Sequence, residues 1–409
     1  MSSLPETGES WDSLQARMDE MSVRDVKWRD GRAAVYVFNA GADIERVQKE
    51  AYARFASENG LGPAAFPSLA RMEREVVSFG LGLLHAPEGA AGNMTSGGTD
   101  SILMAVKAAR DFARSRGRAG RLNLVAPRSA HPAFDKACAL MEIEVRRTPL
   151  RDYLADPEAM AAAADSQTIM VVGSAPCFPY GLIDPIEALG RLAEAEGLWL
   201  HVDACVGGYF APFARMNGAA VPPFDFEVAG VSSMSADLHK YGYCAKGAST
   251  VFFRTEALRK HMIFEVDAWP AGKMVTPTLA GTRPGGAIAA AWAVMNYLGV
   301  AGYRARHALV QETRARIEAG VRAQGYEVIG APMLGIVSFT RADIDCFAVL
   351  KGMFERGWVT SAITDPKGLH LMLSPVHADV ADVYLADLAA ATESARGASG
   401  TVAPSRYGG

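Results

Sequence analysis

Lys240 is the residue of this chain whose neighbours most clearly point to chemistry. It lies in a small polar turn, Ser235-Ala236-Asp237-Leu238-His239-Lys240-Tyr241-Gly242, and upstream of it Asp203 closes an apolar run. A lysine amine can form a Schiff base with an aldehyde, and a strand-end carboxylate can keep a pyridine nitrogen protonated. The set therefore predicts a site for pyridoxal 5'-phosphate (PLP), with Lys240 as the covalent lysine and Asp203 as the partner of the ring nitrogen.

Each of these assignments has an alternative. Lys246 lies in the same segment, but Lys240 is preferred because the adjacent His239 can donate to a phosphate or help to move protons. Lys246 either binds an anionic group of the substrate or is a solvated charge at a strand edge. A buried carboxylate is costly unless it is paired, so without a cofactor Asp203 would need an arginine partner.

Two Gly-rich turns could bind a phosphate. In Thr95-Ser96-Gly97-Gly98-Thr99-Asp100, Gly97 and Gly98 allow the backbone to come close to a ligand, and the helix that follows directs free N–H groups at it. The turn Gly281-Thr282-Arg283-Pro284-Gly285-Gly286 offers a hydroxyl, a guanidinium and backbone donors at a second predicted helix start. The alternatives are a turn that only caps its helix and a turn that carries an exposed arginine.

His131 precedes a predicted helix in Ala130-His131-Pro132-Ala133. At the carboxyl edge of a parallel sheet, an imidazole in this position would lie against the flat ring of a cofactor. The alternative, which the residue itself does not exclude, is a surface histidine that caps a helix.

Alternating strands and helices are expected to position these residues. Between residues 95 and 255, apolar runs predict strands at 121–126, 142–148, 168–173, 198–202, 228–234 and 249–254, with helices in several gaps, notably 131–141 and 185–196. This alternation is typical of an α/β fold with a mostly parallel sheet and helices on both faces. The nearly continuous apolar runs at 168–173 and 198–202 indicate strands that are covered on both sides.

The rest of the chain divides around this unit. We expect an N-terminal helical segment at 1–60, a large PLP-binding domain at 61–300, a small C-terminal α+β domain at 301–395 and a flexible tail at 396–409. Residues 1–30 predict one amphipathic helix, because Trp11, Leu14, Met18 and Met21 recur at helical spacing. A long helix is predicted over 286–325, interrupted near Gly299 and Gly302.

The composition is that of an ordinary soluble globular protein and favours small molecules as its ligands. With 409 residues, 50% of them hydrophobic, and a net charge of −4, the chain has no feature that favours nucleic acid or an anionic membrane. None of the five cysteines is spaced as C-x-x-C, which fits a reducing compartment, so we expect a cytoplasmic protein and no metal site. The polar start predicts no signal peptide, and no membrane anchor is expected.

Five stretches in order resemble the sphingosine-1-phosphate lyase branch of the PLP-dependent group II decarboxylase family, enzymes of fold type I. They are Met94–Leu103, Ala130–Ala137, His201–Gly208, Ser235–Gly247 and Thr276–Gly286, and the similarity spans roughly residues 30–390. The resemblance implies a PLP enzyme that is a homodimer with shared active sites and acts on a small-molecule amine.

The resemblance also implies a role for each matching residue. Lys240 would be the covalent lysine, Asp203 the partner of the ring nitrogen and His131 the residue stacked on the ring. A further group would contact phosphate or substrate: Gly97, Gly98, Thr99 and His239 at the phosphate, Thr282 at the phosphate from the neighbouring subunit, and Tyr36 and Lys246 near the substrate.

Two positions near the substrate depart from the family pattern, and Ala33 also replaces a glycine of the family's Gly-Ala-Val-Tyr stretch. A histidine that helps to hold the end of the substrate corresponds to Gly62, and a tyrosine corresponds to Met274. The favoured reaction is retro-aldol cleavage of a phosphorylated 2-amino alcohol to an aldehyde and an amine. Decarboxylation of an L-amino acid is the main alternative, followed by transamination and by a homodimer that binds PLP without turnover.

Overall fold

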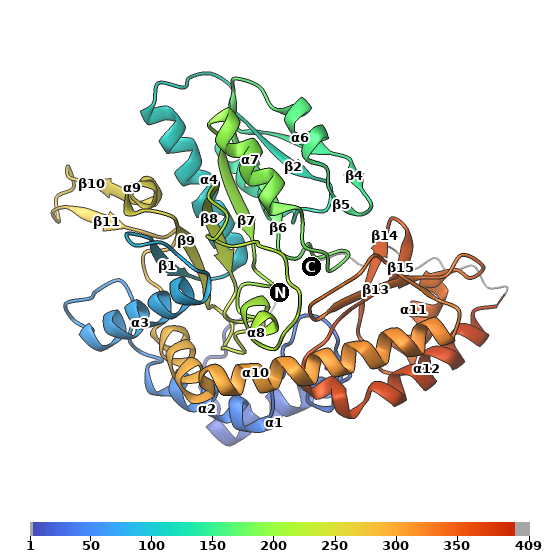
Figure 1. Ribbon diagram of the computed structural model, residues 1–409. Coiled ribbons are helices and arrows are strands. Elements are labelled where there is room, and N and C mark those ends of the chain that lie inside the picture. Colours follow the sequence, from blue (N-terminus) through green and yellow to red (C-terminus); the bar gives the residue numbers. More distant parts are fainter. Residues whose placement is uncertain (1–2, 397–409) are drawn as a thin grey trace.

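The structure of the protein is a computed structural model that describes residues 3–396. The predicted tail therefore lies outside the described residues from position 397 onward. The chain forms a large α/β unit and a smaller C-terminal unit, and one long helix runs along both (Figure 1).

A seven-stranded sheet forms the centre of the large unit, with the strand order β1-β9-β8-β7-β6-β2-β3. The strands are β1 (Ala91–Thr95), β2 (Asn123–Pro127), β3 (Glu144–Thr148), β6 (Thr168–Ser174), β7 (Trp199–Asp203), β8 (Val231–Ala236) and β9 (Ser249–Phe253). Neighbours from β3 to β8 pair in parallel, whereas β9 runs antiparallel to both β8 and β1. The predicted α/β fold with a mostly parallel sheet is confirmed.

Helices cover both faces of this sheet, which is why its central strands consist of buried residues. Every residue of β6 and β7 is buried. Val172 packs in the core beneath α4 (Gly98–Ser115) and α5 (Ala133–Met141), whereas its neighbour Val171 packs in the core beneath α7 (Ile186–Glu196). Successive side chains of a strand point to opposite faces, so both faces need apolar residues.

Several elements escaped the prediction because their residues carry weak signals. Strand β1, Ala-Gly-Asn-Met-Thr, has almost no apolar alternation, and Gly92 is required there because a Cβ would lie 2.6 Å from Phe252. The hairpin β10 (Phe264–Val266) with β11 (Met274–Thr276), the pair β4 (Leu150–Arg151) and β5 (Leu154–Ala155), and α6 (Pro157–Ala163) were also not predicted. The predicted helix over 1–30 is wrong in extent, since α1 spans only Trp11–Ser22.

The long helix α10 (Gly285–Ala323) connects the two units. It has one non-helical residue, Gly299, with φ of 53° and ψ of −174°, close to the predicted interruption and to the expected domain boundary at 300. An 18-residue window of α10 has a mean hydropathy of 1.2, and 56% of that window is buried inside the fold. This is the pattern of a helix that packs in a protein core.

The C-terminal unit is a four-stranded antiparallel sheet with two helices. Its strands, in the order β12-β13-β15-β14, are Glu327–Val328, Ile336–Thr340, Lys367–Met372 and Ser361–Thr364. Helix α11 (Cys346–Glu355) packs on this sheet, and α12 (Ala381–Ser394) packs on α11 and α10. Short apolar runs in the sequence predict strands at 327–330, 334–340 and 369–373, which correspond to β12, β13 and β15, whereas β14 has no such run and was not predicted.

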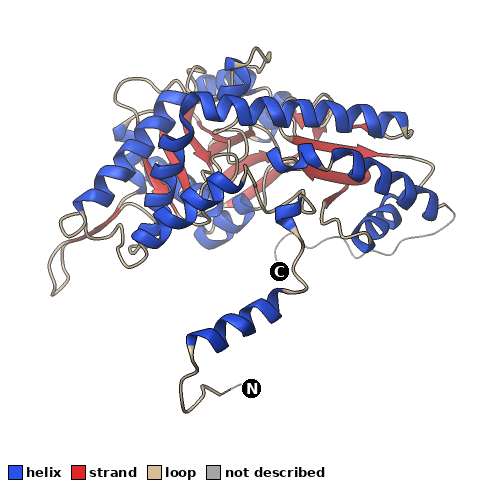
Figure 2. Ribbon diagram, turned by 90° about the horizontal axis from the view of Figure 1, so that it is seen from below, coloured by secondary structure: helices blue, strands red, loops and turns tan. Residues whose placement is uncertain are grey.

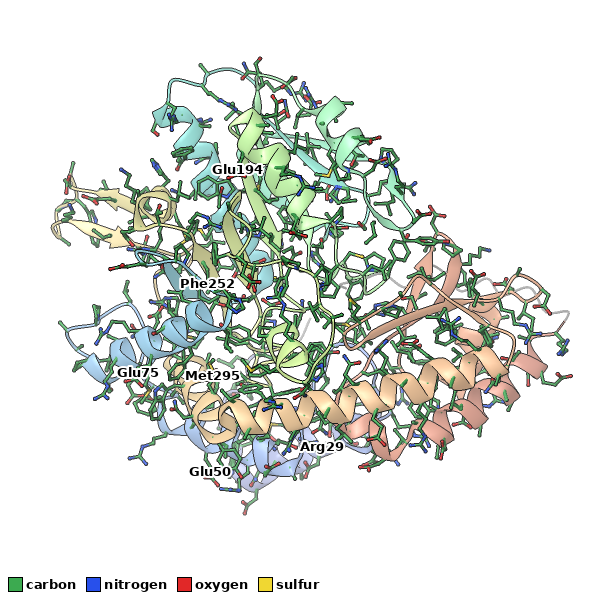
Figure 3. All side chains as sticks on the ribbon, viewed as in Figure 1. Arg29, Glu50, Glu75, Glu194, Phe252 and Met295 are labelled. Atoms are coloured by element: carbon green, nitrogen blue, oxygen red, sulfur yellow. The ribbon has the colours of Figure 1, made fainter. Side chains whose placement is uncertain are left out.

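The N-terminal helices lie against α10, with one exception. Helices α2 (Ala42–Arg54) and α3 (Pro67–Leu83) pack on it, and the Trp292 indole of α10 donates to Glu75 of α3 at 2.6 Å. Figure 3 shows Glu75 beside Met295 at this contact. Helix α1 stands off from the rest of the chain (Figure 2) and buries none of its residues, including Trp11, which is 64% exposed.

Candidate active site

A cavity of about 350 Å³ lies at the carboxyl edge of β6, β7 and β8. In open α/β sheets this is the edge at which ligands bind. The side chains and turns that line it come from segments far apart in sequence: Ser96, Gly97, Gly98, Thr99, Asp100, His131, Ser174, Phe178, Asp203, Cys205, Asp237, His239 and Lys240. The structure thus brings together seven of the predicted site residues, from Gly97 to Lys240.

Asp203 is the last residue of β7 and is 7% exposed. Its Oδ1 accepts hydrogen bonds from the backbone N–H of Cys205 at 3.1 Å and from the hydroxyl of Ser235 at 3.3 Å. Both donors bind the same carboxylate oxygen at the wall of the cavity. An ionised carboxylate here can pair with a protonated ring nitrogen, as the sequence predicted.

Asp237 is the counter-ion of Lys240, and the sequence reasoning gave it no role. Its Oδ2 lies 3.0 Å from Lys240 Nζ and 3.6 Å from His239 Nε2. Burial by itself would raise the pKa of Asp237, but the charges of Lys240 and His239 outweigh burial and lower it below its ordinary value. Asp237 follows the end of β8 as Asp203 ends β7, and this parallel is the signal that could have identified it.

The start of α4 fits a phosphate group. The N-cap residue Gly97 has no side chain to cap the first turn, so the first N–H groups of the helix have no side-chain cap, and Gly97, Gly98 and Thr99 line the cavity. Gly98 has no room for a side chain, because a Cβ would lie 2.8 Å from Asp237 Oδ2 and 2.9 Å from Cys205 Sγ. Asp100, which is negative, is turned back to accept from Ser96 N–H at 2.9 Å and from its hydroxyl at 3.0 Å.

Four buried polar atoms of the cavity have no partner in the described chain, residues 3–396. Two of them can donate to a ligand, namely Nδ1 of His239 and Oγ of Ser174, which is 1% exposed; Oδ1 of Asp100 and Oδ1 of Asp237, on the same lining, are two further buried atoms without a partner. Such atoms are costly unless a ligand satisfies them. Together with the glycine turn, the lysine and the strand-end carboxylate, they fit a ligand that carries a phosphate, polar ring substituents and an aldehyde, which are the features of PLP.

His131 lies two residues before α5 and lines the same cavity. Its Nδ1 accepts the backbone N–H of Ala133 at 3.1 Å, which fixes the ring. Burial lowers the pKa of His131 below its ordinary value, although the charge of Asp203 acts in the opposite direction. A neutral imidazole held in this way can pack flat against a cationic ring.

Tyr36 and Lys246 lie at the edge of the site, beside a second cavity of about 290 Å³ that Lys246 and His239 both line. Lys246 Nζ donates to the carbonyl oxygen of Tyr36 at 2.8 Å and to that of His239 at 3.2 Å. Although its side chain reaches the surface, burial of the amine among protein atoms and the charge of Lys240 lower the pKa of Lys246 to about 8. Lys246 is thus an exposed cation whose amine lies beside the second cavity, and its contact with a substrate stays a prediction.

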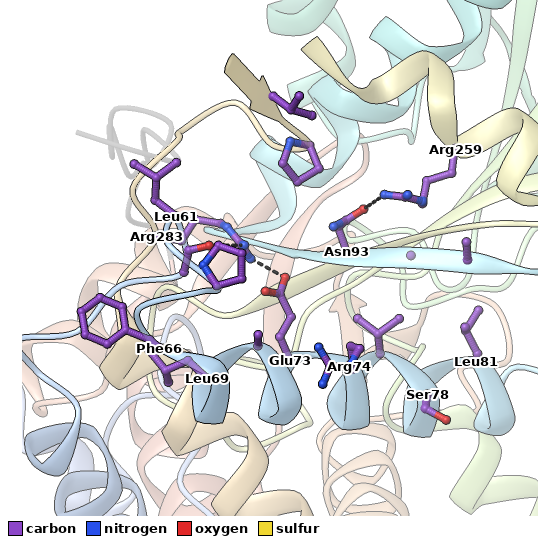
Figure 4. A pocket seen from close by; sticks show the side chains of 18 of the residues that line it. Leu61, Phe66, Leu69, Glu73, Arg74, Ser78, Leu81, Asn93, Arg259 and Arg283 are labelled. Atoms are coloured by element: carbon purple, nitrogen blue, oxygen red, sulfur yellow. Dashed lines mark hydrogen bonds and ion pairs between the residues drawn. The ribbon is translucent and has the colours of Figure 1, made fainter. Parts of the chain in front are cut away.

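Thr282 lies outside the cavity of its own chain and is exposed. The predicted second anion site at 281–286 is wrong in one respect, because Arg283 is buried and bonded within the chain. Its guanidinium pairs with Glu73 and donates to the carbonyl oxygens of Gly60 at 3.1 Å and Met94 at 3.3 Å. Figure 4 shows this pair on the wall of a groove of about 690 Å³ between α3 and β1.

Gly62 and Met274, two of the departures from the family pattern, also lie outside the lining of the 350 Å³ cavity. Gly62 belongs to the loop before α3, and Met274 begins β11. Within one chain neither position lines that cavity.

Comparisons with known proteins agree with this geometry. The model of the pyridoxal-dependent decarboxylase conserved domain matches residues 2–342. Sphingosine-1-phosphate lyase of Oryza sativa is 40% identical over 399 residues, covering 95% of this chain and 74% of that protein. A probable L-tyrosine/L-aspartate decarboxylase of Methanocella arvoryzae is 39% identical over 341 residues, covering 83% of this chain and 88% of the relative.

Comparison with solved structures finds the same kinds of enzyme. The structure of sphingosine-1-phosphate lyase of Burkholderia pseudomallei superimposes with a TM-score of 0.93 at 37% identity, covering 97% of this chain and 94% of that one. A glutamate decarboxylase of Lactobacillus brevis shares the fold, with a TM-score of 0.85 at 18% identity over 98% of this chain and 96% of that one.

Proposed function

Because this chain belongs to the pyridoxal-dependent decarboxylase family, we propose that it is a PLP-dependent lyase that cleaves a carbon–carbon bond of a phosphorylated 2-amino alcohol. The products would be an aldehyde and an amine. The observation that carries the proposal is the convergence of Lys240, Asp203 and His131 on one cavity, in a chain about 40% identical to sphingosine-1-phosphate lyases.

When bound, PLP supplies an aldehyde that condenses with amines and a protonated ring that accepts the electron pair of a breaking bond. Lys240 would attach the cofactor through Nζ and afterwards take up or release a proton at that atom, while Asp237 balances its positive charge. Asp203 would hold a proton at the ring nitrogen, and His131 would cover one face of the ring and exclude water from it.

The phosphate of the cofactor would be bound at the first turn of α4. Backbone N–H groups of Gly98 and Thr99 have no side-chain cap there, and the positive end of the helix dipole favours an anion. The unpartnered ring nitrogen of His239 would donate to the same group. Lys246, beside the neighbouring cavity, would bind an anionic group of the substrate.

The test of this reaction compares two substrate classes. The protein with PLP is incubated with a phosphorylated 2-amino alcohol and, separately, with a panel of L-amino acids, and aldehyde and carbon dioxide are measured. Aldehyde from the first class, lost in Lys240→Ala, supports the lyase. Carbon dioxide from the second class without any aldehyde contradicts it, and keto-acid formation would instead indicate a transaminase.

L-amino-acid decarboxylation is the second candidate, because a relative named as a probable L-tyrosine/L-aspartate decarboxylase is 39% identical. Both reactions need the same cofactor site and differ in which bond to the amine-bearing carbon is broken. If PLP binds but neither substrate class reacts, the protein would be a PLP-binding homodimer without turnover.

We further propose that the active protein is a homodimer with shared sites, located in the cytoplasm. Exposed apolar residues on α1, namely Trp11, Leu14, Met18 and Met21, would be covered by the second copy. Thr282, exposed and away from the cavity of its own chain, would reach the cofactor phosphate bound by the partner.

A mixing experiment tests the shared site. Lys240→Ala removes the covalent lysine, and Thr282→Asp places a negative charge next to the phosphate. If Thr282 acts across the interface, a re-equilibrated equal mixture of the two inactive variants should regain up to about a quarter of wild-type activity, because half of the dimers contain one intact site of two. No recovery, with exchange of subunits demonstrated, would contradict the shared site.

A further inference from the structure

Four buried side chains of β7 and β8 form a line of hydrogen bonds that leads to Asp203. We call this set the strand relay: Trp199, His201, Ser233 and Ser235. In the parallel register His201 is paired with Ser233 and Asp203 with Ser235, so the side chains share one face of the sheet. All four are buried, Trp199 being 4% exposed and the other three fully covered.

The contacts follow one another without a gap. Trp199 Nε1 lies 2.7 Å from Ser233 Oγ, which lies 2.8 Å from Nδ1 of His201. On the other side of the ring, Nε2 lies 3.2 Å from Ser235 Oγ, which lies 3.3 Å from Asp203 Oδ1. None of these residues except Asp203 lines the cavity.

The two ends of the relay determine which atom donates in each of its hydrogen bonds. An indole N–H can only donate, and an ionised carboxylate can only accept. With one proton in each contact, Ser233 donates to Nδ1 of His201, Nε2 donates to Ser235, and Ser235 donates to Asp203. The opposite tautomer would leave the contact between Ser235 and Asp203 without a proton.

Two further observations agree with this direction. Cys205 Sγ also donates to Ser235 Oγ, at 3.3 Å, so both lone pairs of that hydroxyl are used and its proton is left for Asp203. Burial lowers the pKa of His201 to about 4, which keeps the ring neutral with a single N–H at ordinary pH.

We propose that the strand relay positions Asp203 for the cofactor. It does so by fixing the Ser235 hydroxyl as a hydrogen-bond donor to Oδ1 of Asp203. Because the Cys205 N–H also binds Oδ1, Oδ2 is the oxygen that can meet the ring nitrogen. His201 and Ser235 are positioning residues, since they act through Asp203 and do not line the cavity. The inference rests on the proposed PLP site and is independent of which substrate is cleaved.

The tautomer of His201 is measured first, on the unmodified full-length protein with PLP bound. Nitrogen-15 NMR of histidine-labelled protein, assigned with a His201→Gln sample, reports which ring nitrogen carries the proton. We expect a neutral ring protonated at Nε2 from pH 5 to 8. A proton at Nδ1, or a doubly protonated ring in this range, would overturn the relay.

The second measurement follows cofactor affinity with pH in Ser235→Ala. Without the hydroxyl, Asp203 protonates more readily, so the loss of PLP affinity on the acid side should move up by about one pH unit. Ser233→Ala, which removes the hydroxyl on the far side of His201, should move this pH by less. Thr392→Val, which also removes a buried hydroxyl but in α12, should leave the acid limb in place.

Near-ultraviolet circular dichroism confirms that each variant is folded before its affinity is interpreted. A folded Ser235→Ala protein with an unchanged acid limb would contradict the proposal. Absence of PLP binding by the wild-type protein at any pH would contradict the cofactor site as well, and the two failures are therefore distinguishable.

Discussion

Asp237 shows most directly what individual residues contribute to this site. Its carboxylate lies 3.0 Å from the amine of Lys240 and remains ionised despite burial. The convergence of Lys240 and Asp203 could be predicted, because both follow strand ends of one sheet. The contact with Asp237 could not be, since it depends on how the loop between β8 and β9 folds.

Removing the charge of Asp237 is expected to change how Lys240 reacts. In Asp237→Asn the buried ammonium loses its counter-ion, so the neutral, reactive amine should form at lower pH. The pH of half-maximal rate for cofactor attachment to the apo-protein should fall by about one unit. The growth of the visible absorbance band after PLP addition measures this rate, and Lys240→Ala should give no band. An unchanged pH dependence would contradict the role of Asp237.

Lys246 gives a second prediction, which concerns substrate binding at alkaline pH. Its amine, with a pKa lowered to about 8, loses its charge as the pH rises through that value. The Michaelis constant for a phosphorylated substrate should therefore rise up to about tenfold from pH 7 to pH 9. Lys246→Arg should abolish the rise, because guanidinium stays protonated. A flat profile in the wild-type enzyme would exclude Lys246 from anion binding.

At the scale of elements, the first turn of α4 gives the sharpest prediction. Gly98→Ala places a Cβ 2.8 Å from Asp237 Oδ2 and 2.9 Å from Cys205 Sγ, so the turn must move away from the cavity. We expect PLP affinity to fall at least about tenfold, as for the loss of about 1.4 kcal/mol of binding energy. Equilibrium titration of the apo-protein measures it.

Alanine substitutions at two other glycines are controls for the loss of PLP affinity in Gly98→Ala. Gly97→Ala brings its Cβ no closer than 3.6 Å to a neighbouring heavy atom and should weaken PLP binding less. Gly82→Ala, in α3, meets nothing within 4 Å and should leave affinity unchanged. Equal losses in all three variants would mean that the close approach at Gly98 is not the cause.

The elements that the sequence predicted and those that it did not differ in how strongly their residues encode them. Strands β6 and β7 are continuous apolar runs and were predicted within one residue of their observed bounds. Strand β1 was not predicted, because its small residues are selected by contacts such as Gly92 against Phe252 rather than by strand propensity. Such contacts depend on distant parts of the chain.

The whole molecule carries a prediction for acid stability. Burial lowers the pKa of four histidines, His201, His307, His370 and His377, to about 4. The unfolded chain protonates them near pH 6.5, so the free energy of unfolding should fall as the pH drops from about 6.5 to 4. Asp184 opposes this, because burial raises its pKa to about 6.

Unfolding the apo-protein in urea at several pH values tests this balance. Four histidines less one aspartate give an uptake of about three protons between pH 4.5 and 6. His377→Gln, which keeps a polar side chain facing the Ala33 carbonyl, should reduce the uptake by about one proton. An uptake of one proton or fewer in the wild-type protein would mean that these histidines titrate normally.

The family resemblance inferred from the sequence is confirmed by relatives that match more than nine-tenths of the chain. The sequence says less about how copies of the chain assemble. The sequence indicated the apolar stripe of α1, but amphipathic spacing does not specify what covers that stripe.

Helix α10 makes the two units of the fold mechanically dependent on each other. It starts two residues after Arg283, which pairs with Glu73 of α3, and it ends in the C-terminal unit. A helix transmits displacement along its axis, except where a residue such as Gly299, at φ 53°, interrupts it. Any rocking of the C-terminal unit would thus be passed along a lever with one hinge to the loop that carries Lys240, because the Tyr303 hydroxyl of α10 donates to the Gly242 carbonyl at 2.9 Å.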